Sequence, residues 1–148
     1  MAKQVQLVHS IHKARVEEAL RSGLKAESDF DDLGVDIRRN AVYCWLETSD
    51  DKLSAGGQKP DHVYLQATVD ESRCVVADME FSSLALMYRH GQGGRPKDDR
   101  VSALFAESYR LTAVGLSAYA PGMFFTPEVL VQGDIGPECV RLLEDLSS

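Results

Sequence analysis

The chain of 148 residues has the usual length of one domain, and its 44% hydrophobic and 26% charged residues are ordinary for a globular protein. A formal net charge of -7 at pH 7 disfavours unaided, sequence-independent binding to nucleic acid, which relies on neutralising phosphates with lysine and arginine. No stretch approaches the roughly 20 apolar residues of a membrane span, so no membrane association is expected.

The cysteines and the N-terminal segment predict a cytoplasmic protein. Cys44, Cys74 and Cys139 are odd in number and widely spaced, which fits neither a zinc site nor a disulfide framework. Reduced thiols are the simpler interpretation, and no metal site is predicted. The opening segment MAKQVQLVHSIHK lacks an uninterrupted apolar stretch of signal-peptide length.

The first elements in chain order are predicted to be a strand and an amphipathic helix. VQLVH at residues 5–9 is typical of a short strand, and Ser10 is well placed as the N-cap of a helix through HKARVEEALRS. Gly23 would end this helix. Its inward stripe comprises Val16, Ala19, Leu20 and Leu24.

The middle of the chain is predicted to be rich in strands. The acidic stretch ESDFDDLG is irregular, and AVYCWLE at residues 41–47 is typical of a strand. The segment TSDDKLSAGGQKPD then predicts a loop. HVYLQATV at 62–69 and CVVADM at 74–79 are two β-rich segments, which we expect to pair as a hairpin across DESR.

Helices and further strands are expected in the remainder. Residues 81–88 predict a short helix ended by the glycine-rich HGQGGRP, and KDDRVSALFAESYR predicts a second helix. Strands are expected within YRLTAVGLSAY and EVLVQGDI, and Pro137 is expected to open a last helix through ECVRLLEDL. The order of elements predicts a single α+β domain over residues 1–148, with mixed, mostly antiparallel sheets and a few packed helices.

Three segments in a fixed order carry a family resemblance. LVHS lies near the start, AVYCWLE in the middle and PEVLVQGDIGPE near the end, with a helix closing at SGL after the first. This order resembles the ADP-ribosyltransferase superfamily, particularly its histidine-tyrosine-glutamate class and relatives that modify nucleic acids. The resemblance spans most of the chain and implies that NAD is a substrate.

The resemblance gives His9, with the adjacent Ser10, a role in holding NAD. In the family the first-strand histidine hydrogen-bonds the adenosine ribose, and a neutral imidazole suits this task because it both donates and accepts. The alternative is a core or strand-end histidine satisfied by the backbone. His12 is the nearest rival, although its predicted place in the first helix favours His9.

Tyr43 matches the family's aromatic residue that stacks on the nicotinamide ring. A cationic ring over an aromatic face gains roughly 0.5–2 kcal/mol. The alternative for Tyr43 is simple sheet packing, which we favour for Trp45.

Glu128 is the leading catalytic candidate, again by resemblance. Loss of nicotinamide develops positive charge on the ribose, and a fixed carboxylate near C1′ stabilises the oxocarbenium-like transition state. Because Glu128 opens the apolar run EVLV, we expect it at the mouth of a strand, within reach of a cleft and not fully buried. An edge charge or a loop cap is the alternative.

One departure from the family bears on the acceptor of the ADP-ribosyl group. Thr126 stands where many protein-modifying members carry glutamine or glutamate, which argues against an arginine acceptor. A nucleic acid, a protein hydroxyl or water stays open as the acceptor, the last making the protein an NAD glycohydrolase. The same departure motivates the alternative of a non-catalytic module that binds an ADP-ribose-like nucleotide or a protein partner.

Two further segments offer polar groups outside this pattern. The stretch HGQGGRPKDDR brings Arg95 and Lys97 together with three glycines, which suits a substrate or pyrophosphate loop, although a mobile surface connection is the blander interpretation. Its spacing is neither a Walker A nor a Rossmann fingerprint. Asp78 and Glu80 in VADMEF suit either a hard cation or a helix cap.

Overall fold

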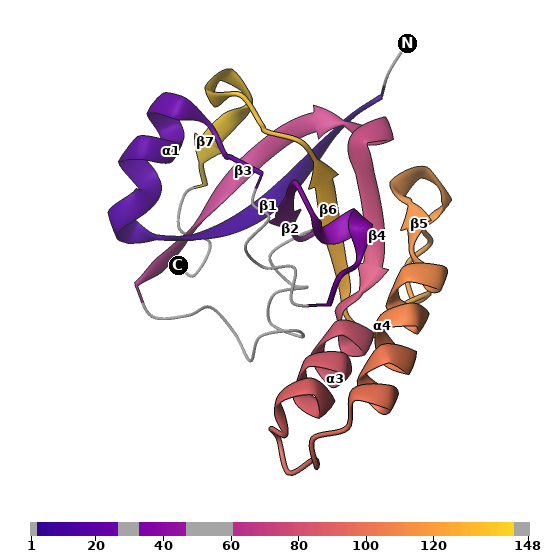
Figure 1. Cartoon of the computed structure of the whole chain (residues 1–148). Coiled ribbons are helices and arrows are strands. Elements are labelled where there is room, and N and C mark those ends of the chain that lie inside the picture. Colours follow the sequence, from indigo (N-terminus) through magenta and orange to yellow (C-terminus); the bar gives the residue numbers. More distant parts are fainter. Residues whose placement is uncertain (1–2, 27–32, 47–60, 144–148) are drawn as a thin grey trace.

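The computed structural model describes residues 3–26, 33–46 and 61–143, and its strands form two antiparallel sheets (Figure 1). The first sheet has the order β1-β3-β7, with β1 at Gln4–His12, β3 at His62–Asp70 and β7 at Val140–Leu142. The second has the order β2-β6-β4-β5, with β2 at Ala41–Cys44, β6 at Pro127–Gln132, β4 at Cys74–Asp78 and β5 at Val114–Gly115. Every strand pair in this part of the chain is antiparallel.

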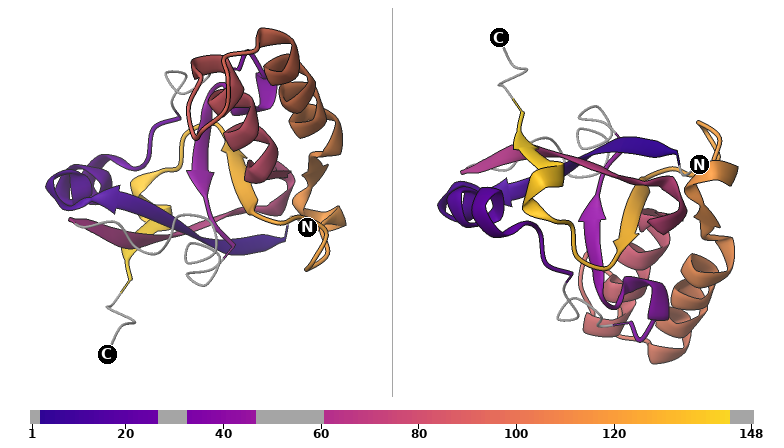
Figure 2. Two further views of the ribbon diagram at one scale, coloured as in Figure 1. Left: turned by 90° about the horizontal axis from the view of Figure 1, so that it is seen from below. Right: turned by 90° about the horizontal axis from the view of Figure 1, so that it is seen from above.

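Three α-helices accompany these sheets in the described residues. They are α1 at Val16–Ser22, α3 at Met79–His90 and α4 at Asp99–Thr112. Figure 2 shows α3 and α4 side by side on one side of the strands and α1 on the other. The predicted α+β fold with antiparallel sheets is therefore confirmed.

Side-chain alternation along β6 divides the core into two clusters. Val129 and Val131 belong to the larger cluster, which also holds the apolar side chains of β1 and β3 and so joins the two sheets. Leu130 points to the opposite face, where it joins the smaller cluster around Tyr109 of α4. The even-numbered side chains of β6 therefore face the helices, because successive strand residues point to opposite faces.

Local signals explain where the two long helices begin and end. Asp78 caps α3 by accepting the Glu80 N–H, and Asp98 caps α4 by accepting the N–H groups of Arg100 and Val101. Gly91 ends α3 in the left-handed conformation at φ 64°. The predicted helices over 81–88 and 97–110 are confirmed, with these wider or shifted bounds.

The predicted first helix starts later than expected. β1 continues through Ser10 to His12, so Ser10 is a strand residue and not an N-cap. His12 caps a short 3-10 turn at Lys13–Arg15, and α1 follows. Pairing with β3, which extends from Gln4 opposite Asp70 to His12 opposite His62, overrides the local capping signal.

Two other expectations about topology are wrong. The segments at 62–69 and 74–79 do not form a hairpin: β3 and β4 belong to different sheets, and the 3-10 turn Glu71–Arg73 carries the chain between them. Pro137 opens only a 3-10 turn, and β7 then pairs with β3 where a helix was expected. Most of the acidic stretch and of the predicted loop after Glu47 lies outside the described residues.

A search of the described ranges finds no helix that is both long and apolar enough to span a membrane.

Candidate functional site

A pocket lies where the edge strand β2 separates from its neighbour in the sheet, β6. The two strands pair from Ala41 as far as Cys44, which lies opposite Val129. At the next residue, Trp45, the chain leaves β6 and forms an isolated bridge with Val8 of β1. Glu128, the next residue on β6, therefore has its strand partner only on the β4 side, opposite Ala77.

This separation opens a pocket of about 400 Å³, within the usual size of ligand sites. Its lining comes from β1, from the α1 turn and helix, from β2, from the start of β3 and from β6. All four residues that the sequence assigned to NAD and catalysis contribute to this lining: His9, Ser10, Tyr43 and Glu128. Trp45, expected to be a packing residue, also lines the pocket.

His9 is half-buried on β1 and is held from β2. Its Nδ1 lies 2.7 Å from the Tyr43 carbonyl oxygen. Because a carbonyl can only accept, Nδ1 carries the proton, and in the neutral ring Nε2 is then the acceptor. The backbone thus satisfies one nitrogen, as the structural alternative expected, and at the same time fixes the tautomer of a pocket-lining histidine.

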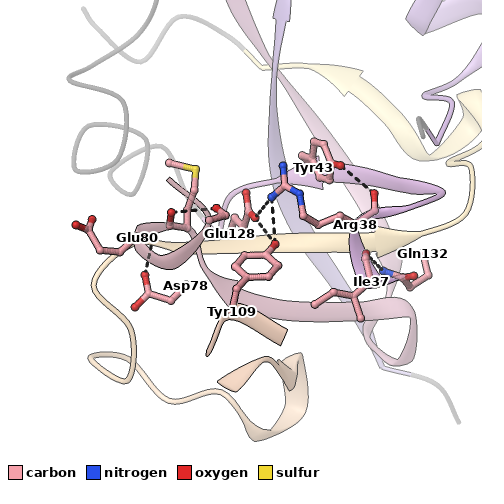
Figure 3. Close-up of polar contacts among 10 residues, drawn as sticks. Ile37, Arg38, Tyr43, Asp78, Glu80, Tyr109, Glu128 and Gln132 are labelled. Carbon is pink, nitrogen blue, oxygen red and sulfur yellow. Dashed lines mark hydrogen bonds and ion pairs between the residues drawn. The ribbon is translucent and has the colours of Figure 1, made fainter. Parts of the chain in front are cut away.

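Two contacts with Arg38 hold the Tyr43 side chain, one at its hydroxyl and one at the face of its ring. Its hydroxyl donates to the Arg38 carbonyl oxygen over 2.9 Å, and the Arg38 guanidinium lies over its ring at 5.0 Å from the ring centroid (Figure 3). One face of the ring is therefore covered by a cation. A ligand ring can stack only on the opposite face.

Glu128 is buried in an ion pair, not placed at an exposed strand mouth. It is 5% exposed, and its strand lies between β2 and β4, so the expectations of partial exposure, an edge charge or a loop cap are wrong. Arg38 Nη1 donates to Glu128 Oε1 over 3.0 Å, and the Tyr109 hydroxyl donates to the same oxygen over 2.5 Å (Figure 3). The Arg38 partner removes the cost of an unpaired buried carboxylate that made burial unattractive from sequence.

The protonation of this cluster follows from its burial. Burial raises the pKa of the Glu128 carboxyl, and the opposing effects of Arg38 and of the Tyr109 hydrogen bond do not cancel the shift. Burial also raises the pKa of Tyr109, with a further contribution from the Glu128 charge, so its hydroxyl stays a donor. For Arg38 burial acts to lower the pKa, but Glu128 and the two tyrosines raise it overall, so the guanidinium stays charged.

The two carboxylate oxygens of Glu128 differ. Oε1 accepts both hydrogen bonds. Among the described residues, Arg38 Nε is the one fully buried side-chain polar atom without a hydrogen-bond partner. Oε2 accepts neither of these two bonds, and Glu128 is among the residues that line the pocket.

The structure does not bring the glycine-rich stretch to this pocket. Arg95 folds back on α3, with Nη1 3.3 Å from Met87 Sδ and the guanidinium over the Tyr88 ring, and Lys97 pairs with Asp99 over 3.3 Å. Neither Arg95 nor Lys97 is among the pocket-lining residues.

Asp78 and Glu80 are accounted for by capping. Asp78 accepts the Glu80 N–H at the start of α3, which is the helix-cap alternative. In the described ranges no group of three or more His, Cys, Asp and Glu side chains is arranged to hold a metal ion.

Two partners of Glu128 had no role in the sequence interpretation. Neither Arg38 nor Tyr109 was singled out from the sequence. They lie 90 and 19 residues from Glu128 in the sequence, so no local motif links the three. The one available signal was physical: a carboxylate in an apolar strand needs a cationic partner.

Comparisons with protein-family models, with curated proteins and with solved structures found no match to this chain.

Proposed function

We propose that this protein binds NAD in the pocket between β1 and β2 and promotes cleavage of the nicotinamide–ribose bond, as an ADP-ribosyltransferase-like enzyme. The observation that carries the proposal is the convergence of His9, Tyr43 and Glu128, from three strands and three distant segments, on one pocket. Ser10 joins them from β1. Perturbed carboxylates in a cleft are enriched at functional sites.

Each side chain has a chemical role in this proposal. His9 Nε2 accepts a ribose hydroxyl, and its tautomer is set by the Tyr43 carbonyl. The Tyr43 ring stacks on the cationic nicotinamide, an attraction of roughly 0.5–2 kcal/mol that is lost when the ring leaves neutral. Glu128 Oε2 faces the ribose and stabilises the positive charge that develops as the bond to nicotinamide breaks.

Arg38 sets the strength of this stabilisation. Its guanidinium shares Oε1 with Tyr109, so it keeps the carboxylate oriented while withdrawing part of its charge from the pocket. Orientation favours catalysis, because a fixed carboxylate needs no reorganisation during the reaction. Charge withdrawal opposes catalysis, so the rate of nicotinamide release depends on the negative charge that Oε2 retains.

The acceptor and the location remain part of the proposal. Thr126 argues against arginine as the acceptor and leaves water, a hydroxyl or a nucleobase. The net charge of -7 disfavours nucleic acid unless a local basic surface assists. We also propose a cytoplasmic location, where the free thiols of Cys44, Cys74 and Cys139 would stay reduced.

A second candidate is a binding module that recognises an ADP-ribose-like nucleotide, or a protein partner, without catalysis. Two observations favour it: Thr126 replaces the family's acid or amide, and Glu128 is buried against Arg38 with a raised pKa. A protonated Glu128 would not stabilise a cationic ribose.

Calorimetric titration with NAD and ADP-ribose, run beside a chromatographic assay of nicotinamide release, separates the candidates. Binding of NAD with release supports the enzyme, and binding without release supports the module. Tyr43→Leu should weaken NAD binding about 2- to 30-fold, the equivalent of the stacking energy. Failure to bind either nucleotide would remove both nucleotide functions.

A further inference from the structure

The start of β6 cannot be held by the strand ladder alone. Its first residue is Pro127, which lies opposite Asp78 of β4 and has no N–H to donate. Phe125 precedes it with 84% of its surface exposed, so packing does not fix its position either. The catalytic candidate Glu128 is the second residue of this strand.

The Asp78 side chain supplies the missing connection. Its Oδ2 accepts the Phe125 N–H over 3.1 Å, and its Oδ1 accepts the Thr126 N–H over 3.1 Å. The same Oδ1 accepts the Glu80 N–H at the start of α3. Asp78 is 3% exposed, so these bonds are shielded from competing water. The backbone adds one further bond, from Met79 N–H to the Thr126 carbonyl.

We infer that Asp78 is a positioning residue for Glu128: by joining α3 to the segment Phe125–Thr126, it fixes the entry of β6 and so the direction in which Glu128 Oε2 meets the ribose. Asp78 is not among the residues that line the pocket. The inference rests on the proposed function for its effect on turnover. Its effect on the position of Glu128 does not depend on that function.

The distinct roles of the two oxygens suggest a selective variant. In Asp78→Asn the amide oxygen can take the place of Oδ1 and retain the Glu80 and Thr126 bonds, while its NH₂ group faces the Phe125 N–H, donor against donor. Asp78→Ser retains a helix-capping oxygen but is too short to hold both loop amides. Asp98→Asn is the matched control, because Asp98 caps α4 with the same chemistry and has no bond to the segment before β6.

The first readout is nicotinamide release. We expect kcat to fall about tenfold in Asp78→Asn and about a hundredfold in Asp78→Ser, because displacement of a catalytic group by about 1 Å has effects of that size. KM should stay within about twofold, since His9 and Tyr43 lie on other strands. Asp98→Asn should match the wild type. Unchanged kcat in a folded Asp78→Ser variant would overturn the inference.

The second readout is independent of activity. The negative charge of Asp78 is one of the contributions, after burial, that raise the pKa of Glu128. Asp78→Asn and Asp78→Ser remove this charge equally but retain different numbers of bonds to the segment before β6. In ¹³C-labelled protein, the carboxyl resonance of Glu128 should therefore titrate with a different midpoint in Asp78→Ser than in Asp78→Asn, and Asp98→Asn should match the wild type. Equal midpoints in the two Asp78 variants would overturn the positioning role. If the wild type releases no nicotinamide but the two midpoints differ, the proposed function fails and the positioning role stands.

Discussion

Replacing Tyr109 by phenylalanine isolates the buried cluster around Glu128. The ring, which is 0% exposed, remains in place, and only the hydroxyl is lost. That hydroxyl donates to Glu128 Oε1 over 2.5 Å and accepts from Arg38 Nη1 over 3.3 Å. Hydrogen bonds to charged groups contribute about 1.5–3 kcal/mol each, and Arg38 keeps its bond to Glu128, so we expect a loss of about 1.5–3 kcal/mol.

Thermal and urea unfolding measure this loss. For a chain of this length it corresponds to a lower melting temperature by roughly 3–12 °C. Tyr88→Phe is the control, since the Tyr88 hydroxyl has no hydrogen bond in the described residues while its ring stacks on Phe105. In a Glu128→Gln background the same Tyr109 change should cost only about 1 kcal/mol, because the bond is then neutral. A Tyr109→Phe loss no larger than that of the control would refute the buried charge-assisted bond.

Two further predictions concern the backbone and the titration of the site. Gly23→Ala should lower the free energy of unfolding in urea by about 2 kcal/mol or more, because Gly23 has φ 84° and an added Cβ would lie 2.2 Å from the Ile135 carbonyl oxygen. Gly34→Ala is the control: Gly34 has φ 69° but open space around it, so its replacement should cost less. The raised pKa of Glu128 means that the folded state holds its proton more tightly than the unfolded state, so the contribution of Glu128 to stability is fully present below about pH 4.3 and falls as pH rises through the folded pKa. Unfolding free energies of the wild type and Glu128→Gln, compared from pH 4 to 8, should therefore converge or cross as the pH rises, and a constant difference would contradict the shift.

The sequence was most informative where a local signal and the tertiary structure agree. The helices at 79–90 and 99–112 each begin after a capping aspartate. The first ends at a glycine and the second where the backbone becomes extended, so the existence of both was predictable. The strand EVLVQ was predictable from its composition because it is buried on both faces.

The errors arose where long-range pairing decides the structure. His12 and Ser10 are held in β1 by β3, although Ser10 is a good helix cap, and residues 140–142 join β3 although ECVRLLEDL has helical character. No single-sequence pattern records which strand a segment will meet. Tertiary contacts therefore overrode propensity in both places.

At the candidate site, too, the sequence indicated some features and long-range contacts decided others. The sequence singled out residues 9, 43 and 128 through a resemblance, and all three line one pocket. The burial of Glu128 and its pairing with Arg38 and Tyr109 could not be predicted, because those contacts exist only after the turn before β2, strand β6 and helix α4 have packed together.

Nicotinamide release by Glu128 variants tests the central claim most directly. Removing one partner of a buried ion pair costs roughly 3–5 kcal/mol, so Glu128→Gln should be assayed at low temperature with circular dichroism as the check of folding. Glu128→Asp keeps the charge but withdraws it from the ribose, and Glu138→Gln, at an exposed carboxylate outside the pocket, is the control. We predict that folded Glu128→Gln loses about a hundredfold or more of the wild-type rate, that Glu128→Asp is also impaired and that Glu138→Gln is unchanged. Wild-type turnover in the folded Glu128→Gln variant would contradict the account.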